Sequence, residues 1–563
     1  MNSTNLMRLL VFGAFALITS ANLTAQDKLV AILDEEIQRE MEYLKKQEIP
    51  AYYISYRVDD IYSSTLYTSF GSLANTIESK ASYLTVTVRV GSPELDNYHP
   101  LRGENAGYSM PLQIDLPGVD KPLAIKQVLW GATTTAYQAA VANFAKVKAN
   151  VATKVEEEDK SPDFVLGQPN VSIDAPFKPE ELKFNKADWE TRLKKYSGLF
   201  LKDKSIFNGI SMILYRAERK YYVSSNGDKV VQNGTSAYAA VSGTIKAEDG
   251  MELPLMETYF AFKPEGLPSD KEMTKNVNDI VNNLIALKNA PTAEPFSGPA
   301  LLSGEASGVF FHEIFGHRVE GSRMRNENDA QTFKKKVNES VLPASFTISC
   351  DPQMKEFNGL GLNGYYKFDD EGQKGQHVNI VEKGTLKTFL MSSTPIKGIS
   401  GSNGHARAQF SYQPVSRQSN LVIETSEPKK EEELRAELIR MAKEQNKPYG
   451  YLFQKVVGGF TNTGRFVPNS FNVTPTLVYR IYTDGRPDEI VRGVDLIGTP
   501  LSMFSQIDQA GGKIGIFNGT CGAESGGVSV SSVSPMILVK MIETQKKSKS
   551  QERNFIIPRP DNK

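Results

Sequence analysis

The spacing of apolar and polar positions divides the chain into a first half that mixes helices with strands and a second half dominated by strands. Apolar residues recur at helical spacing in four stretches, residues 29–47, 123–155, 187–202 and 271–287. Residues 51–90 and 210–262 are instead rich in β-branched and aromatic residues with period-two stretches, which predicts strands of a meander. The turn residues Asn226, Gly227 and Asp228 interrupt the second of these regions.

Beyond residue 324 the chain is rich in glycine and β-branched residues, and one charged helix is predicted over residues 431–445. Strands are predicted at residues 345–349, 378–381, 385–391, 476–482 and 528–533. Helices and strands are segregated and do not alternate as βαβ units. This arrangement favours antiparallel sheets and an α+β fold class.

The length of 563 residues exceeds what one compact core usually holds, so at least two domains are expected. Residues 290–300 have the Pro-rich composition of a linker. We therefore predict an N-terminal α+β domain over residues 26–289 and a β-rich C-terminal domain over residues 301–545, followed by a basic tail over residues 546–563.

The first 25 residues have the order of a signal peptide: a short basic start, an apolar stretch from Leu9 to Ile18, and small polar residues up to Ala25. The apolar stretch is about half of the ~20 residues that a membrane-spanning helix needs. No later segment is long and apolar enough to span a membrane. We therefore expect cleavage after Ala21 or Ala25 and a mature protein in the periplasm or outside the cell.

Charge and cysteine content narrow the function further. Lys+Arg and Asp+Glu both number 65, and no basic run is dense enough to follow a phosphate backbone, which argues against nucleic acid as a partner. The two cysteines, Cys350 and Cys521, are too few for a disulfide framework. Export would still permit one disulfide between them.

Two of the five histidines flank a glutamate in the apolar segment His312-Glu313-Ile314-Phe315-Gly316-His317. In the familiar zinc-peptidase helix the histidines are four residues apart, so both rings face one metal. A spacing of five places them about 140° apart on an ideal helix. The rings can share a metal only if the helix widens or ends between them, and Gly316 provides such a break.

A catalytic zinc takes three protein ligands, so a third must come from elsewhere in the chain. The candidates are His377, His405, Cys350, Cys521 and the carboxylates. Cys521 lies among glycines that let the backbone approach a ligand or metal, and thiolate binds zinc strongly. A ligand and a disulfide partner of Cys350 are equally good interpretations of Cys521 at this point, whereas Cys350 itself reads as a core thiol.

Residues 312–321 resemble the metal motif of the TldD/PmbA family of zinc metallopeptidases, in which the one-residue displacement of the second histidine is a hallmark. Further segments match the family in order, at residues 368–372, 380–386, 410–417 and 519–522. Together the matches span residues 304 to about 535.

The resemblance implies that His312, His317 and Cys521 hold zinc and that Glu313 is the catalytic acid/base. It also implies a β-rich, barrel-like second domain that carries the metal-binding helix. The expected quaternary structure is a dimer that encloses the active site, either a homodimer or a heterodimer with a family paralogue. The expected substrate is a peptide or unfolded polypeptide, docked as an added strand.

Other residues and other functions remain open at this stage. His405, in a Gly-rich loop, and Arg417 are predicted to bind substrate, and Glu320 is predicted to orient a histidine ligand. Asp369, Asp370 and Glu371 read as a solvated turn. The alternatives to a peptidase are a non-catalytic peptide-binding partner subunit of the same family and a metal-free envelope binding protein.

Overall fold

The computed structural model describes residues 27–101, 116–152, 159–465, 470–547 and 560. The predicted signal peptide and most of the predicted basic tail lie outside these ranges. None of the helices within them combines the length and the apolar character needed to cross a membrane.

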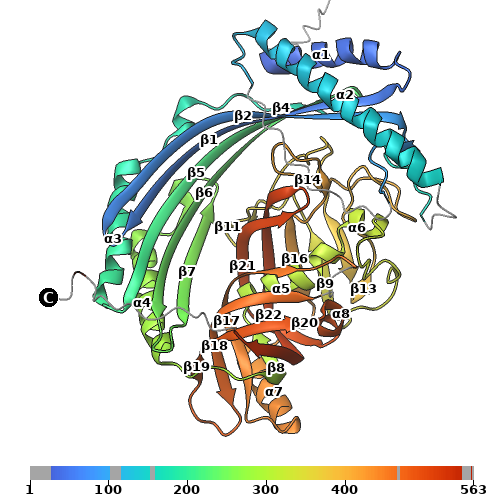
Figure 1. Cartoon of the computed structure of the whole chain (residues 1–563). Helices are drawn as coiled ribbons and strands as arrows, with labels where there is room; N and C mark the ends of the chain where they lie inside the picture. The colour runs from blue at the N-terminus through green and yellow to red at the C-terminus, as the bar shows by residue number, and fades with distance from the viewer. Residues whose placement is uncertain (1–26, 102–115, 153–158, 466–469, 548–559, 561–563) are drawn as a thin grey trace, which may run out of the picture.

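The first half of the described chain builds one long, curved antiparallel sheet with helices on its outer side (Figure 1). Its strands are β1 (Ala51–Ser69), β2 (Ser72–Ser92), β3 (Leu95–Asp96), β4 (Val171–Ile173), β5 (Ile206–Ser224), β6 (Lys229–Lys246) and β7 (Glu252–Ala261). The order is β3-β2-β1-β5-β6-β4, with β7 on the free part of β6, and only the β4–β6 pair is parallel.

Four helices cover this sheet: α1 (Lys28–Leu44), α2 (Pro122–Ala152), α3 (Lys186–Gly198) and α4 (Asp270–Asn289). Helices α1 and α2 pack on β1 and β2 at one end, and α3 and α4 pack on β1 and β5 to β7 at the other (Figure 1). Short 3₁₀ turns, η1 (Pro179–Leu182), η2 (Leu199–Lys202) and η3 (Pro264–Gly266), connect them. The helix predicted over residues 187–202 therefore ends four residues early, as α3 followed by η2.

The second half is built on an 11-stranded mixed sheet. Its strands are β8 (Phe296–Leu302), β9 (Phe346–Cys350), β12 (Val378–Glu382), β13 (Thr385–Leu386), β16 (Asn420–Thr425), β17 (Tyr449–Thr461), β18 (Phe471–Tyr482), β19 (Glu489–Val491), β20 (Val494–Gly498), β21 (Ile507–Ala523) and β22 (Gly526–Lys546). Strand β8 pairs with both β17 and β22, so β22, β20, β18, β17 and β8 form a ring.

Smaller elements complete this half: the pairs β10 (Glu356–Phe357) with β11 (Leu360–Gly361) and β14 (Ala406–Arg407) with β15 (Val415–Ser416), and the helical segments α5 (Gly304–Ile314), η4 (Gly316–Arg318), α6 (Gly321–Arg325), α7 (Glu431–Glu444) and α8 (Pro500–Phe504). The molecule is thus α+β, as predicted, with the second half rich in strands.

Helix α5 is held tightly against the sheet because two of its residues are glycines. A β-carbon on Gly304 would lie 2.2 Å from the backbone nitrogen of Gly515 in β21, and one on Gly308 would lie 3.0 Å from Ser532 in β22. The Ser303 hydroxyl caps the helix by accepting a hydrogen bond from the Ala306 amide.

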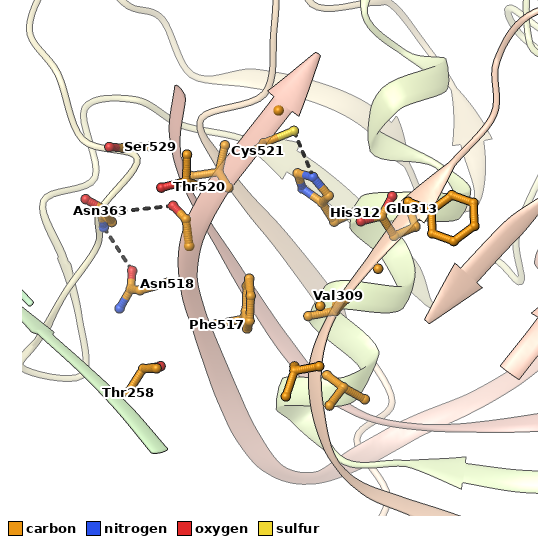
Figure 2. Close-up of a pocket in the computed structure, with 18 of the residues that line it drawn as sticks. Thr258, Val309, His312, Glu313, Asn363, Phe517, Asn518, Thr520, Cys521 and Ser529 are labelled. Carbon is orange, nitrogen blue, oxygen red and sulfur yellow. Dashed lines mark hydrogen bonds between the residues drawn. The ribbon is translucent and has the colours of Figure 1, made fainter. Parts of the chain in front are cut away.

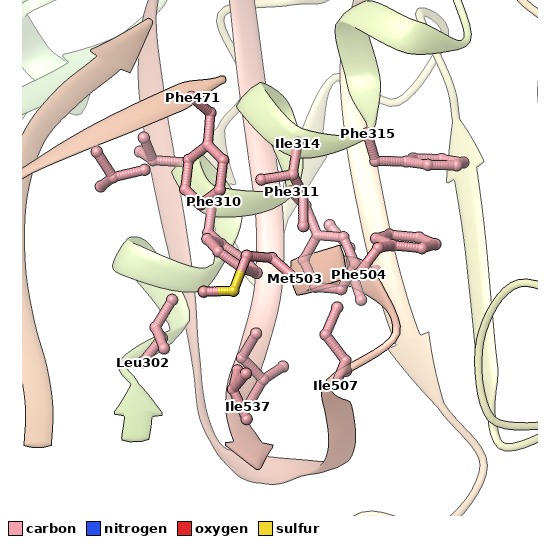
Figure 3. Close-up of a cluster of buried hydrophobic side chains, with 14 of the residues drawn as sticks. Leu302, Phe310, Phe311, Ile314, Phe315, Phe471, Met503, Phe504, Ile507 and Ile537 are labelled. Atoms are coloured by element: carbon pink, nitrogen blue, oxygen red, sulfur yellow. The ribbon is translucent and has the colours of Figure 1, made fainter. Parts of the chain in front are cut away.

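The other face of α5 carries large apolar side chains that are fully buried. Phe310, Phe311, Ile314 and Phe315 pack against Phe471 and Phe504, with the rings of Phe315 and Phe504 stacked 4.9 Å apart (Figure 3). Packing on both faces fixes the helix, and with it the two histidines at its end.

Several predicted boundaries differ from the structure. Residues 296–300 of the predicted linker belong to β8, because this strand pairs with the long strands β17 and β22. The strand predicted over residues 385–391 ends at Leu386. Strands β17 and β21, which have glycines within them, have no counterpart in the sequence prediction.

Candidate metal centre

The two histidines of the motif lie at the end of α5, where the helix stops between them. Helix α5 ends at Ile314, and residues 316–318 form the 3₁₀ turn η4. As a result, the rings of His312 and His317 lie with their centroids 4.9 Å apart and their planes at 80°. The five-residue spacing is therefore accommodated by the end of the helix.

Cys521, on β21, completes a cluster with these histidines. Its Sγ lies 3.2 Å from Nε2 of His312 and 3.3 Å from Nε2 of His317, and the three candidate ligand atoms all lie within 4.8 Å of one another. We call these three residues the ligand cluster. His312, His317 and Cys521 are 8 %, 7 % and 5 % exposed.

The ligand cluster fits a tetrahedral zinc ion. Bond lengths of about 2.0–2.3 Å from zinc to imidazole nitrogen and thiolate sulfur place neighbouring donor atoms roughly 3.5 Å apart. The two nitrogen–sulfur distances are within a few tenths of an ångström of that separation. Three buried donors of types that prefer zinc, with one coordination position left over, form the pattern of a catalytic site.

Glu313 lies next to the cluster with one carboxylate oxygen available. Its Oε2 atom is buried and has no hydrogen-bond partner among the described residues. Strand β17 passes closely over this side chain, since a β-carbon on Gly459 would lie 2.8 Å from Cγ of Glu313. The Arg318 guanidinium donates a 2.7 Å hydrogen bond to the Glu313 carbonyl oxygen, which fixes the backbone.

The pKa values of the three residues in the ligand cluster depend on one another's charges. Burial by itself raises the pKa of the Cys521 thiol, but His317 and His312 lower it well below its usual value. Burial by itself lowers the pKa of His317, but Cys521 and Glu320 raise it to about 10, and Cys521 likewise raises that of His312. The thiolate and the two imidazoles therefore favour each other's charged forms, and a bound cation would compensate the thiolate in place of the protons.

The pKa of Glu313 is raised, mainly by burial, while His312 and His317 oppose this shift. A carboxylate with a raised pKa is suited to taking up a proton and giving it back. The geometry and the electrostatics of Glu313 thus agree with the predicted acid/base.

Glu320 lies behind the cluster, as predicted for a residue that orients a ligand. It is fully buried, and its Oε2 atom accepts hydrogen bonds from Nδ1 of His317 at 3.2 Å and from Nε of Arg323 at 2.9 Å. His317 and Arg323 together hold the Glu320 pKa well below its usual range against the effect of burial. The bond to Nδ1 leaves Nε2 of His317 facing Cys521.

The two predicted substrate-binding residues both lie in the protein interior. His405 is fully buried, with Nδ1 near the carbonyl and side-chain oxygens of Asn403 and Nε2 3.3 Å from the Ser419 hydroxyl. Burial lowers its pKa to about 3. Arg417 is also fully buried and contacts Cys521. Neither side chain lines the two cavities described below, and a role of either residue in substrate binding stays a prediction.

The remaining candidates for a third ligand lie elsewhere. Cys350 is buried on β9, 3.1 Å from the Ser419 hydroxyl, and both it and Cys521 are free cysteines, so the disulfide alternative is not realised. His377 is exposed, beside Asp351 and Asn379.

The acidic run at residues 369–371 is not the solvated turn that we predicted. Asp369 and Asp370 are 3 % and 6 % exposed. Asp370 accepts a 2.5 Å hydrogen bond from Lys220 on β5, and Asp369 accepts one from the amide of Ala406. Asp370 thus joins the two halves of the molecule, and Asp369 holds a segment within the second half, which local sequence could not reveal.

The ligand cluster opens into a cavity of about 990 Å³ between the two halves, which we call the metal-site cavity (Figure 2). One wall is the sheet of the first half, with Met256 and Thr258 of β7. The other wall contains Val309, Phe517 and the ligand cluster. A second cavity of about 770 Å³ shares lining residues such as Asn363 and Thr520 with the first, so the two adjoin.

Figure 2 shows Phe517, Asn518, Thr520 and Cys521 along one strand, opposite His312 and Glu313 on α5. The sequence singled out the three residues that the structure brings together and Glu313 beside them, but not the wall residues on β5 to β7 or the close approach of Gly459. The glycine pair Gly458-Gly459 was the only local signal of that approach.

The chain is similar to known metallopeptidases. Residues 296–546 match the family described as the PmbA/TldA metallopeptidase C-terminal domain. A metalloprotease of Archaeoglobus fulgidus is 33 % identical over 264 residues, which is 46 % of this chain and 56 % of that protein. A zinc metalloprotease TldD homolog of Saccharolobus solfataricus is 25 % identical over 333 residues, covering 58 % of this chain and 68 % of its own length.

This chain spans only about half the length of the curated metalloproteases that it matches first. Two solved structures share the fold over 91 % of this chain. One is TldE from Thermococcus kodakarensis, with a TM-score of 0.59, 15 % identity and 100 % of its chain covered. The other, from Thermotoga maritima, is described as a putative modulator of a DNA gyrase, with a TM-score of 0.58, 17 % identity and 99 % covered.

Proposed function

Since this chain belongs to the TldD/PmbA family of metallopeptidases, we propose that it is a zinc-dependent peptidase that hydrolyses peptide bonds in peptides or unfolded polypeptides. The observation that carries the proposal is the ligand cluster with a free carboxylate oxygen beside it: His312, His317 and Cys521 would hold the zinc, and Glu313 would act as the acid/base.

A zinc ion held by His312, His317 and Cys521 would supply Lewis-acid activation of a water molecule and of the scissile carbonyl group. Glu313 would accept a proton from water at Oε2, the oxygen that has no hydrogen-bond partner among the described residues, and would return it to the leaving amine. The close approach of β17 at Gly459 and the hydrogen bond from Arg318 to the Glu313 carbonyl oxygen limit the positions that the carboxylate can adopt.

The metal-site cavity and the cavity that adjoins it suit an extended chain. Both lie between the two sheets, which are also joined by the hydrogen bonds of Lys455 on β17 to Glu257 on β7 and of Arg492 to Asp249. A folded domain does not fit into 990 Å³. We therefore propose peptides or unfolded segments as substrates.

We also propose that the protein is exported, on the basis of the signal-peptide pattern at residues 1–25. Mass spectrometry of the mature N-terminus from periplasm and medium tests export. An N-terminus at Met1 in the cytoplasmic fraction would refute it.

We further propose that the protein acts as a homodimer or with a family paralogue. Light scattering on the purified protein tests the dimer, and a monomer at all concentrations would refute the homodimer.

The peptidase proposal is tested by incubating the zinc-loaded protein with an unfolded polypeptide and with the same polypeptide in its folded form. The expected result is cleavage of the unfolded form only, abolished by a chelator and restored by added zinc. A fully zinc-loaded protein, alone and with its native partner, that cleaves neither form would overturn the proposal and favour a peptide-binding role.

A further inference from the structure

The ligand cluster is assembled from two elements that are far apart in sequence. The histidines come from α5 and η4, whereas Cys521 comes from β21, near the end of the β21–β22 hairpin, where it faces Val528 of β22. Zinc needs all three donor atoms within a few tenths of an ångström of their positions. The site therefore needs side chains that hold the hairpin against the helix.

Arg417 contacts both elements at once. Its segment lies between β15 and β16, and its side chain is fully buried. Nη2 donates hydrogen bonds to the carbonyl oxygen of Cys521 at 2.7 Å and to its Sγ at 3.2 Å. Nη1 donates to the Ser525 hydroxyl at 2.8 Å and to the Gly526 carbonyl at 3.1 Å. One guanidinium therefore holds both strands of the hairpin end.

The same guanidinium faces the helix side through Glu320. Nε of Arg417 lies 3.5 Å from Oε1 of Glu320, which is an ion pair and not a hydrogen bond. The second oxygen of Glu320 bonds to Nδ1 of His317. A continuous chain of contacts thus runs from His317 through Glu320 and Arg417 to the Sγ of Cys521.

We propose that Arg417 is a positioning residue that sets the thiolate of Cys521 in register with His317, and that it does not contact substrate. The inference rests on the proposed zinc site. It goes beyond that site by assigning a buried residue to metal retention.

The contacts require an arginine. A guanidinium carries five N–H donors in a planar fork, so it can bond to a carbonyl oxygen, a sulfur and a hydroxyl in fixed directions. A lysine ammonium is a point charge on a flexible stem and cannot make these contacts together. Truncation would also leave Glu320 without one of the cations that compensate its buried charge.

The test measures metal binding and not activity alone. Zinc affinity is determined by chelator competition, and the cobalt-substituted protein is examined for its thiolate-to-cobalt charge-transfer band, for wild type, Arg417→Lys and Arg407→Lys. Arg407 is a matched control, because it is a buried arginine that donates to two backbone carbonyls, of Gln418 and Ser529, but not to the cluster.

Loss of a residue that supports a ligand typically lowers metal affinity about 10- to 100-fold. We expect that loss and an altered or weakened charge-transfer band in Arg417→Lys, and neither change in Arg407→Lys. An Arg417→Lys protein with wild-type affinity and an unchanged band would overturn the inference, whereas a wild-type protein that binds no zinc or cobalt would overturn the proposed function instead.

If Arg417→Lys does not fold, Ser525→Ala takes its place. This change removes one anchor of the guanidinium and leaves its charge. We expect a smaller loss of affinity in the same direction, and an affinity equal to that of wild type would contradict the inference.

Discussion

The sheet of the first half and the sheet of the second half face each other across the metal-site cavity, but they contribute different things to it. The second half supplies the ligand cluster, Glu313 and the residues that hold them, within the range that matches the family, residues 296–546. The first half supplies one wall of side chains, from β5 to β7, and no ligand. The residues proposed to carry out the reaction and the residues that form the opposite wall of the cavity therefore lie in separate parts of the chain. Variants in the two halves should change different properties of the protein.

The largest effect is expected for Glu313→Gln, which would remove the proton acceptor without removing a ligand. General acid–base catalysis contributes about 10²–10⁴-fold, so the kcat for peptide hydrolysis should fall by that factor. Zinc content should stay that of wild type. The kcat of wild type and that of Glu313→Gln are measured in parallel. If the two differ only slightly, another group takes the proton.

Gly459→Ala should test whether catalysis depends on the position of the Glu313 carboxylate, because this change keeps the carboxylate but moves it. The added methyl group would lie 2.8 Å from Cγ of Glu313 and 2.7 Å from the Asn472 carbonyl, so the carboxylate must shift. A misplacement of about 1 Å can cost on the order of 10²-fold in rate, and we expect a loss of that order in kcat with zinc retained. Gly401→Ala, where the methyl group meets nothing within 4 Å, is the control.

Met256→Ala tests the wall of the first half. Met256 lies on β7, is 40 % exposed and lines the metal-site cavity. Loss of its apolar contact with substrate, about 1 kcal/mol, should raise KM roughly five-fold and leave zinc content unchanged. Leu123→Ala, at an exposed position on α2, controls for a general effect. Loss of zinc in Met256→Ala would break the division between the two halves.

The last effect concerns the stability of the second half in acid and not the site itself. His405 has a pKa of about 3 in the folded chain, against about 6.5 in an unfolded one. The unfolded chain therefore binds a proton that the folded chain does not, and the free energy of unfolding falls as pH drops from about 6.5 towards 3, by at most ~1.4 kcal/mol per pH unit.

The variant His405→Gln should show a shallower decline of unfolding free energy over this range, measured by denaturant titration at several pH values. Wild type and variant with identical slopes would show that His405 does not contribute.

The parts of the site that sequence alone predicted are those carried by contiguous residues of unusual type. Two histidines and a glutamate in an apolar helix are rare, and Gly316 marked where that helix had to end. Cys521 was one of several candidates for the third ligand, and its choice over the others and over a disulfide depended on the resemblance to the family.

The missed or wrong features depend on contacts between distant segments. Burial of His405, Arg417 and Asp369 follows from loops that fold over one another, and no local pattern distinguishes them from exposed loop residues. Strand β21 contains five glycines, at positions 511, 512, 515, 519 and 522, which interrupt the alternation of apolar and polar side chains, so period-two analysis does not detect it. Its long pairing with β22 defines it as a strand.

The most direct test of the account is the metal content of the purified mature protein, measured by mass spectrometry for wild type, His317→Ala, Cys521→Ser and Met256→Ala. We predict about one zinc per chain in wild type and in Met256→Ala, as in a single three-ligand site, and loss of zinc in the two ligand variants. Zinc retained in Cys521→Ser and His317→Ala, or absent from wild type after reconstitution, would contradict the central claim.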